Sequence, residues 1–186
     1  MEGIKRMAYE SVGEILDSID ETRNRLLARV ESLSAAECEV RPSSDVWSVA
    51  EIVEHLSISE EGVMKLIGMM LAKAEAGGTV AKETGRRFEP VSIDHFTERS
   101  LKEKYEAPEF IRPRGGVSLA DSIARMQQIR ATLHGMRPRL EAADLTNARY
   151  PHPMFGPLNA YQWLLFIGAH EERHLRQIET IVSEAR

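Results

Sequence analysis

Apolar side chains recur at three- and four-residue spacing in four long segments of the chain, and this is the period of an amphipathic α-helix. The first stripe is Val12, Ile15, Leu16, Ile19, Leu26, Val30 and Leu33. The second is Val49, Ile52, Val53, Leu56, Val63, Ile67 and Met70. The third includes Met126, Ile129, Leu133 and Met136, and the fourth includes Trp163, Ile167, Ile178 and Ile181. No competing stretch alternates as a β-strand does. The pattern predicts an all-α protein, and a four-helix bundle is the natural architecture.

Polar residues, glycine and proline mark where the predicted helices begin and end. Serine and a carboxylate three residues later have capping spacing at Ser34 with Glu37, Ser48 with Glu51, and Ser118 with Asp121. The second helix is expected to stop at Gly77-Gly78, and the third to be disturbed at Pro138. The fourth should start after Pro157 and run almost to residue 186.

About 40 residues, from 77 to 117, separate the second and third predicted helices and are rich in glycine, proline and charge. A connection of this length is usually functional or contains a helix of its own. Residues 92–105 could form such a short helix, with Phe96 and Leu101 among the residues packed on the bundle. The connection is also long enough to run the length of the bundle, so a simple up-down order of helices does not follow.

Length and composition fit a single domain over residues 1–186, large enough to bury a core. With 42% apolar and 28% charged residues and a net charge of −5, nothing favours nucleic acid or an anionic membrane as partner. Residues 1–6 lack the apolar region of a signal peptide, and no run approaches the roughly 18 apolar residues of a membrane span. The single cysteine, Cys38, fits a reducing cytoplasm and is expected to be a packed filler rather than a nucleophile.

The fourth predicted helix carries two histidines at positions i and i+4, His170 and His174. Residues at this spacing stand one above the other on a helix, so both imidazoles can ligate one ion. At 100° per residue they fall in line with Trp163 and Ile167 and therefore point into the bundle. An uncompensated polar group costs about 1–3 kcal/mol there. Two such groups in one helical turn predict a common partner.

His55 lies at the edge of the apolar stripe of the second helix, from which its side chain can reach the space between helices. Three neutral imidazoles with one open position form a common catalytic zinc arrangement. Imidazole also suits nickel, copper and iron, so the histidines do not identify the metal. For His55 alone, a hydrogen bond to a backbone carbonyl or a carboxylate is the alternative. A purely structural role for all three histidines, without metal, also stays open.

Residues 170–174 read HEERH and so match the H-E-x-x-H of zinc proteases. Only 12 residues follow His174, and they lack the metzincin continuation H-x-x-G-x-x-H. No strand is predicted that could bind an extended peptide, so the sequence disfavours a protease. Glu171 nevertheless projects toward the flank of the inward face and is the candidate catalytic residue, touching metal-bound water or orienting a ligand. Glu51 is a second candidate proton shuttle, although capping is the simpler role for it.

Two stretches of the chain carry a family resemblance: residues 41–56, RPSSDVWSVAEIVEHL, and residues 158–174, LNAYQWLLFIGAHEERH. The combination of W-S-x-x-E-x-x-x-H on one helix with H-x-x-x-H on the last is fairly specific. The chain resembles the DinB-like superfamily, which includes YfiT-type metal-dependent hydrolases and thiol-dependent S-transferases. The resemblance covers nearly the whole length and implies a four-helix bundle with a long crossover, often a homodimer. It also implies that His55, His170 and His174 hold a divalent ion, Zn²⁺ or Ni²⁺ in some members.

The expected function is a metal-dependent enzyme that activates a thiol or water, as a low-molecular-weight-thiol S-transferase or a hydrolase acting on a small molecule. The resemblance to the DinB-like superfamily implies that such a thiol would be bacillithiol, mycothiol or glutathione. The alternative is a non-catalytic metal- or small-ligand-binding stress-response module. Arginines of the central loop, Arg86, Arg87, Arg112 and Arg114, could hold the carboxylates of such a thiol, although a solvated loop is the simpler account. His152, between two prolines, is a weaker candidate for a substrate contact.

Overall fold

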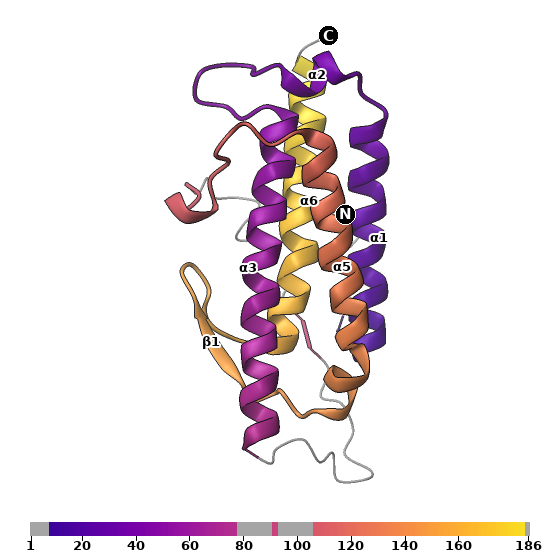
Figure 1. Ribbon diagram of the computed structural model, residues 1–186, viewed down its shortest axis with the longest axis vertical. Coiled ribbons are helices and arrows are strands. Elements are labelled where there is room, and N and C mark those ends of the chain that lie inside the picture. The colour runs from indigo at the N-terminus through magenta and orange to yellow at the C-terminus, as the bar shows by residue number, and fades with distance from the viewer. Residues whose placement is uncertain (1–7, 78–90, 93–105, 185–186) are drawn as a thin grey trace, which may run out of the picture.

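The computed structural model describes residues 8–77, 91–92 and 106–184, and their helices form a four-helix bundle (Figure 1). The helices are α1 (Val12–Glu31), α2 (Ala35–Glu39), α3 (Val49–Ala76), α5 (Leu119–Ala142) and α6 (Ala160–Glu184), with a 3₁₀ turn, η1 (Glu109–Ile111). Helix α6 packs against α1 and α3, and α5 packs mainly against α3. The prediction of an all-α bundle is therefore confirmed. No described helix is both long enough and apolar enough to traverse a bilayer.

The order of helices departs from a simple up-down bundle. The colour gradient of Figure 1 shows that α3 and α5 run in one direction, whereas α1 and α6 run in the other. The chain between α3 and α5 must therefore return along the length of the bundle, and this accounts for its length. The short helix expected within this connection falls on residues 93–105, which lie outside the described part of the chain, as do Arg86 and Arg87.

Side-chain caps begin the helices at the positions that the sequence indicates. The Ser48 hydroxyl accepts a hydrogen bond from the backbone N–H of Glu51, whose carboxylate accepts one from the N–H of Ser48. Equivalent serine caps open α2 at Ser34 and α5 at Ser118. Helix α3 ends at Ala76, one residue before Gly77. Glu51 therefore has the capping role that was the simpler of its two predicted roles.

Helix α5 continues through Pro138 to Ala142, whereas the sequence suggested a disturbance at the proline. A proline inside a helix removes one backbone hydrogen bond and costs about 3 kcal/mol. Leu133 and Leu140, on either side of Pro138, are both fully buried in the core. Their packing holds the helix on both sides of the proline, so the proline does not end it.

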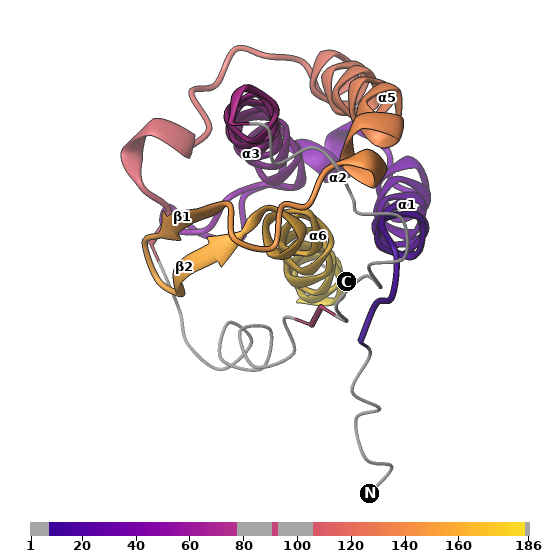
Figure 2. The same ribbon diagram turned by 90° about the horizontal axis from the view of Figure 1, so that it is seen from below.

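A β-hairpin precedes α6, in a segment where no strand was predicted. Its strands are β1 (Arg149–His152) and β2 (Gly156–Asn159), which pair antiparallel with Pro151 opposite Pro157. Two prolines within four-residue strands hide the strand pattern in the sequence, because proline cannot donate to a sheet. Gly156 has a φ of +71°, which a side chain would strain. In Figure 2 the hairpin lies on the same side of the bundle as η1, next to α3 and α6.

Helices α1 and α6 approach closely at Gly168. A Cβ at this position would lie 2.9 Å from Cγ2 of Ile19 and 3.5 Å from its Cα. We expect Gly168→Ala to lower the free energy of unfolding by about 1–3 kcal/mol, because the added methyl overpacks the contact. Gly135→Ala on α5 is the matched control, since no atom of the described part of the chain lies within 4 Å of a Cβ built there. It should raise stability by up to about 1 kcal/mol. Urea denaturation measures both, and equal effects would argue against the close approach.

Candidate metal centre

The three histidines predicted from the sequence meet between α3 and α6. His55 comes from α3, and His170 and His174 come from successive turns of α6. The Nε2 atom of His170 lies 3.2 Å from Nε2 of His55 and 3.1 Å from Nε2 of His174. One ligand atom from each of the three lies within 4.8 Å of the others. Nitrogen ligands of a tetrahedral zinc ion are separated by roughly 3.3 Å, given bonds of about 2.0–2.1 Å. The spacing therefore suits a single ion.

Oxygen acceptors behind two of the rings fix which nitrogen faces the centre. The Nδ1 atom of His55 lies 2.7 Å from the carbonyl oxygen of Ile111, and that of His174 lies 2.8 Å from Oε1 of Gln177. Because these oxygens can only accept, Nδ1 carries the proton in both rings and Nε2 presents a lone pair. Such an arrangement is typical of metal-ligating histidines, whose other nitrogen donates to a carbonyl or carboxylate.

The ring of His170 cannot satisfy both of these lone pairs. Its Nε2 faces the Nε2 atoms of His55 and His174 and, as a neutral imidazole, can donate one proton at most. At least one pair of nitrogen lone pairs therefore meets without a hydrogen between them. A cation at the centre removes this conflict, since it accepts electron density from all three rings. The residues present thus fit a divalent ion.

Burial keeps the three imidazoles neutral. Loss of solvation lowers the pKa of His55 and lowers that of His174 to about 3. For His170, burial and then the neighbouring His174 and His55 hold the pKa well below its usual value. Neutral imidazole is the form that binds metal, so the site is ready to bind an ion near pH 7 without first losing protons.

Aromatic rings pack against two of the three histidines. Phe166 stacks on His170 with ring centroids 5.3 Å apart, and Trp47 packs against His55 at 5.0 Å. His152, at the end of β1, lies 4.7 Å from Phe166 on centroids. Burial lowers the pKa of His152 to about 4. His152 therefore belongs to this group of rings, with Phe166 in contact with both it and His170, and it is not one of the three clustered histidines.

Glu171 takes part in a buried ionic cluster that draws one residue from each long helix: Arg23, Glu60, Arg130 and Glu171. Nε of Arg23 donates to Oε1 of Glu171 at 2.9 Å, and Nη2 of Arg23 also bonds both Glu60 and Glu171. Nη2 of Arg130 lies 3.2 Å from Glu60 and 3.3 Å from Glu171. Two cations thus balance two carboxylates within the core. Glu171 was predicted as a site residue from the sequence, whereas Arg23, Glu60 and Arg130 were not.

The second carboxylate oxygen of Glu171 faces a different environment. Oε2 is buried and has no hydrogen-bond partner among the described residues. A small cavity of about 10 Å³ lies beside it, roughly the space that one water molecule needs. The cavity is lined by Leu56, Ser59, Glu60, Val63, Phe166, Ile167, His170 and Glu171. Burial, opposed by Arg23 and Arg130, raises the pKa of Glu171 to about 7. Glu171 and the candidate ligand His170 therefore line the same small cavity.

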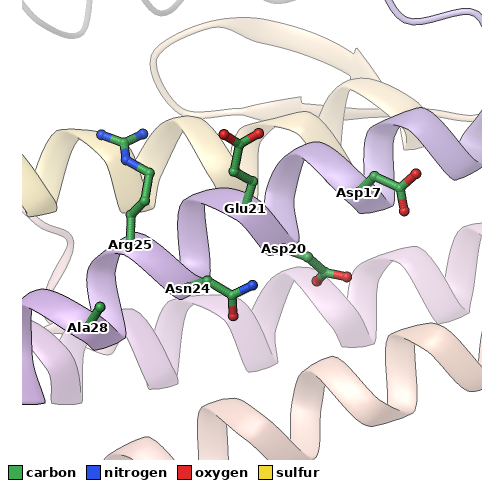
Figure 3. Close-up of a pocket in the computed structure, with 6 residues that line it drawn as sticks. All are labelled: Asp17, Asp20, Glu21, Asn24, Arg25 and Ala28. Carbon is green, nitrogen blue, oxygen red and sulfur yellow. The ribbon is translucent and has the colours of Figure 1, made fainter.

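Other described residues that were considered in the sequence do not join the centre. Arg112 is exposed and bonds Glu106 and the carbonyl of Ala107 within its own loop. Helix α1 bears a shallow depression lined by residues 17, 20, 21, 24, 25 and 28, all from this one helix (Figure 3). Asp20 within it bonds Arg130 at 2.6 Å and His134 at 2.8 Å, and so connects the ionic cluster to the surface. Cys38 is buried, and burial raises the pKa of its thiol, as suits a packed filler.

A bundle of four long helices with three histidines converging between two of them defines a helical protein with a candidate metal centre in its core. Residues 18–178 match the sequence profile of the DinB superfamily, and the chain belongs to this superfamily. It is similar to YuaE of Bacillus subtilis (strain 168), with 26% identity over 163 residues, 87% of this chain and 93% of YuaE.

Two solved structures share the fold. TT2238, a four-helix bundle protein, has a TM-score of 0.59 at 20% identity and covers 90% of this chain and 98% of its own. YfiT from Bacillus subtilis, described as "a probable metal-dependent hydrolase with an unusual four-helix bundle topology", has a TM-score of 0.53 at 16% identity. That match covers 97% of this chain and 93% of YfiT. These likenesses support the bundle and its unusual helix order.

Proposed function

We propose that the protein is a metal-dependent enzyme whose three-histidine site activates water, or a low-molecular-weight thiol, for attack on a small-molecule substrate. The observation that carries this proposal is the convergence of Nε2 from His55, His170 and His174, two of them with Nδ1 held by an oxygen. A bound Zn²⁺ or Ni²⁺ supplies Lewis acidity and lowers the pKa of a water or thiol at its open position. The description of YfiT as "a probable metal-dependent hydrolase" supports the same proposal.

The surroundings of Glu171 favour water over a thiol as the group that is activated. The cavity shared by His170 and Glu171 has room for one water molecule. Arg23 and Arg130 hold Oε1 of Glu171, which leaves Oε2 free to accept a proton from a group in this cavity. Glu171 is therefore the proposed general base. Its carboxylate is kept in place by the arginines.

Metal content of the untagged protein tests the first half of the proposal. We expect wild-type protein to carry close to one Zn²⁺ or Ni²⁺ per chain after extensive dialysis, and His174→Ala to carry little, because two imidazoles hold an ion far less tightly than three. His134→Ala is the matched control, since His134 is partly exposed and bonded to Asp20 rather than to the centre. Elemental analysis measures all three proteins. Wild type with no more metal than His174→Ala would overturn the proposed site.

Assays of the metal-loaded protein test the second half. Ester and amide panels probe hydrolysis, and electrophile panels with bacillithiol, mycothiol or glutathione probe thiol transfer. Thiol-dependent turnover without hydrolysis would overturn the preference for water. Metal-loaded protein inactive on every panel would instead support the non-catalytic alternative, a metal- or small-ligand-binding module.

We also propose that the protein acts as a homodimer in the cytoplasm, with a small molecule rather than nucleic acid or a membrane as its partner. The family resemblance supports the dimer, and the net charge of −5 gives no attraction to polyanions. Light scattering on the purified protein tests the dimer directly. A mass near the 21.0 kDa of one chain would contradict it.

A further inference from the structure

Glu54, the residue before His55 on α3, has a carboxylate buried at 4% exposure. Its Oε1 accepts the backbone N–H of Arg114 at 2.9 Å, and its Oε2 accepts that of Gly115 at 3.2 Å. No cationic side chain in the described residues forms an ion pair with it. The negative charge is therefore satisfied by two successive backbone amides, which together form a small anion-binding nest.

The loop that supplies these amides also supplies the oxygen behind His55. Ile111 accepts from Nδ1 of His55 at 2.7 Å, and its carbonyl lies three residues before the N–H of Arg114. Two adjacent residues of α3, Glu54 and His55, thus form hydrogen bonds to the same loop, residues 106–117. Gly115 has a φ of +72° and Gly116 of +80°, and this left-handed turn suits glycine.

Hydrophobic burial contributes little to holding this loop in place. Its largest apolar side chain, Phe110, is 70% exposed, Val117 is exposed, and Ile111 is only half-buried. The Arg112 side chain bonds within the loop rather than to the bundle. The carboxylate of Glu54 is therefore a principal anchor between the loop and α3, next to the bond that the loop makes with His55.

We propose that Glu54 is a positioning residue for the candidate ligand His55 and acts through the loop 106–117. By fixing the amides of Arg114 and Gly115, it keeps the Ile111 carbonyl against Nδ1 of His55, so that Nε2 presents its lone pair to the centre. This inference rests on the proposed metal site for its functional meaning, although the placement of the loop and the protonation of the His55 ring do not require a metal.

Nitrogen-15 NMR of the histidine rings in the metal-free full chain at pH 8 tests the positioning itself. We expect wild-type His55 to show the Nδ1–H tautomer and Glu54→Ala to show a mixture of both, because the freed loop no longer supplies a fixed acceptor. Glu54→Gln keeps one acceptor oxygen and should fall between them. Glu61→Ala, a charge loss at a partly exposed position of α3, should match the wild type. An unchanged His55 tautomer in Glu54→Ala would overturn the inference.

Competition for Zn²⁺ with a coloured chelator tests the consequence for metal binding. Loss of an outer partner of a metal-ligating histidine weakens binding about 10–100-fold, and we expect this for Glu54→Ala. Glu61→Ala should stay within twofold of wild type, and Co²⁺ absorption should change shape only in the Glu54 variants. If Glu54→Ala does not fold, Glu54→Gln carries the comparison. If wild type and the folded Glu54 variants bind Zn²⁺ with equal affinity, the inference is overturned. If wild type binds no Zn²⁺ but the tautomer of His55 changes in Glu54→Ala, only the proposed metal site is overturned.

Discussion

Arg23→Met is expected to lower the free energy of unfolding by about 3–5 kcal/mol, a large share of the stability of a single domain. Arg23 is buried and donates to the carboxylates of Glu60 and Glu171 and, at 3.1 Å, to the carbonyl of Met126. Methionine fills similar space but leaves two buried carboxylates balanced by Arg130 alone. The charge that remains is buried without a full complement of cationic partners, so the variant should lose most of its resistance to urea.

The matched control is Arg25→Met, two residues further along α1. The Arg25 side chain is 53% exposed and pairs with Glu172 at 2.8 Å, so its loss should cost less than about 1 kcal/mol. A double variant, Arg23→Met with Glu60→Met, removes one charge of each sign and leaves Arg130 paired with Glu171 at 3.3 Å. It should be more stable than Arg23→Met alone. If Arg23→Met and Arg25→Met lowered the free energy of unfolding equally, the buried carboxylates would not depend on Arg23 for compensation of their charge.

The sequence contains a pattern that could have indicated this ionic cluster, namely charged residues at core-facing positions of the predicted helices. Arg23 lies four residues after Ile19 and three before Leu26, so it occupies a core position of α1. The same spacing places Glu60 between Leu56 and Val63, and Arg130 between Met126 and Leu133. A charged residue at such a position in each of several helices predicts mutual pairing in the core. Which carboxylate meets which guanidinium depends on how the helices are rotated and stacked, and no local pattern contains that.

The helices themselves were predictable because their determinants are local. Apolar spacing, serine caps and the glycine after α3 each act within a few residues, and the structure has them where the sequence indicates. The hairpin before α6 was missed because Pro151 and Pro157 interrupt strands of only four residues. The continuation of α5 beyond Pro138 was missed because core packing outweighs a local helix breaker there.

The candidate metal centre also has parts that local sequence patterns predict and parts that they do not. His170 and His174 were predicted from their shared face, and Gln177, three residues after His174, was within reach of the same reasoning because it lies on the next turn. A backbone carbonyl as the partner of His55 was one of the sequence-based alternatives, and the structure contains it, but Ile111 as its source could not be predicted. A backbone oxygen carries no residue signature, and the loop that presents it has no periodicity to place it over α3.

Adding Zn²⁺ to chelator-treated protein is expected to raise the melting temperature by about 8–16 °C. An ion that binds only the folded state, at a thousand times its dissociation constant, adds about 4.1 kcal/mol to stability. One kcal/mol shifts the melting temperature of a domain of this size by about 2–4 °C. The physical source is the relief of facing lone pairs among His55, His170 and His174, which the metal-free protein must otherwise bear. Differential scanning fluorimetry across a Zn²⁺ titration measures the shift.

Mg²⁺ and His170→Ala separate binding at the histidines from binding at surface carboxylates. Mg²⁺ prefers oxygen ligands and should leave the melting temperature unchanged, whereas Ni²⁺ should act as Zn²⁺ does. The metal-free His170→Ala variant loses the stacking on Phe166 as well as one of the facing nitrogens, so its own melting temperature without metal is the baseline for its titration. The variant should then gain nothing from Zn²⁺. If Zn²⁺ still raised the melting temperature of His170→Ala, the stabilising ion would bind elsewhere, for instance among the acidic residues of α1. The three histidines would then not be the metal site.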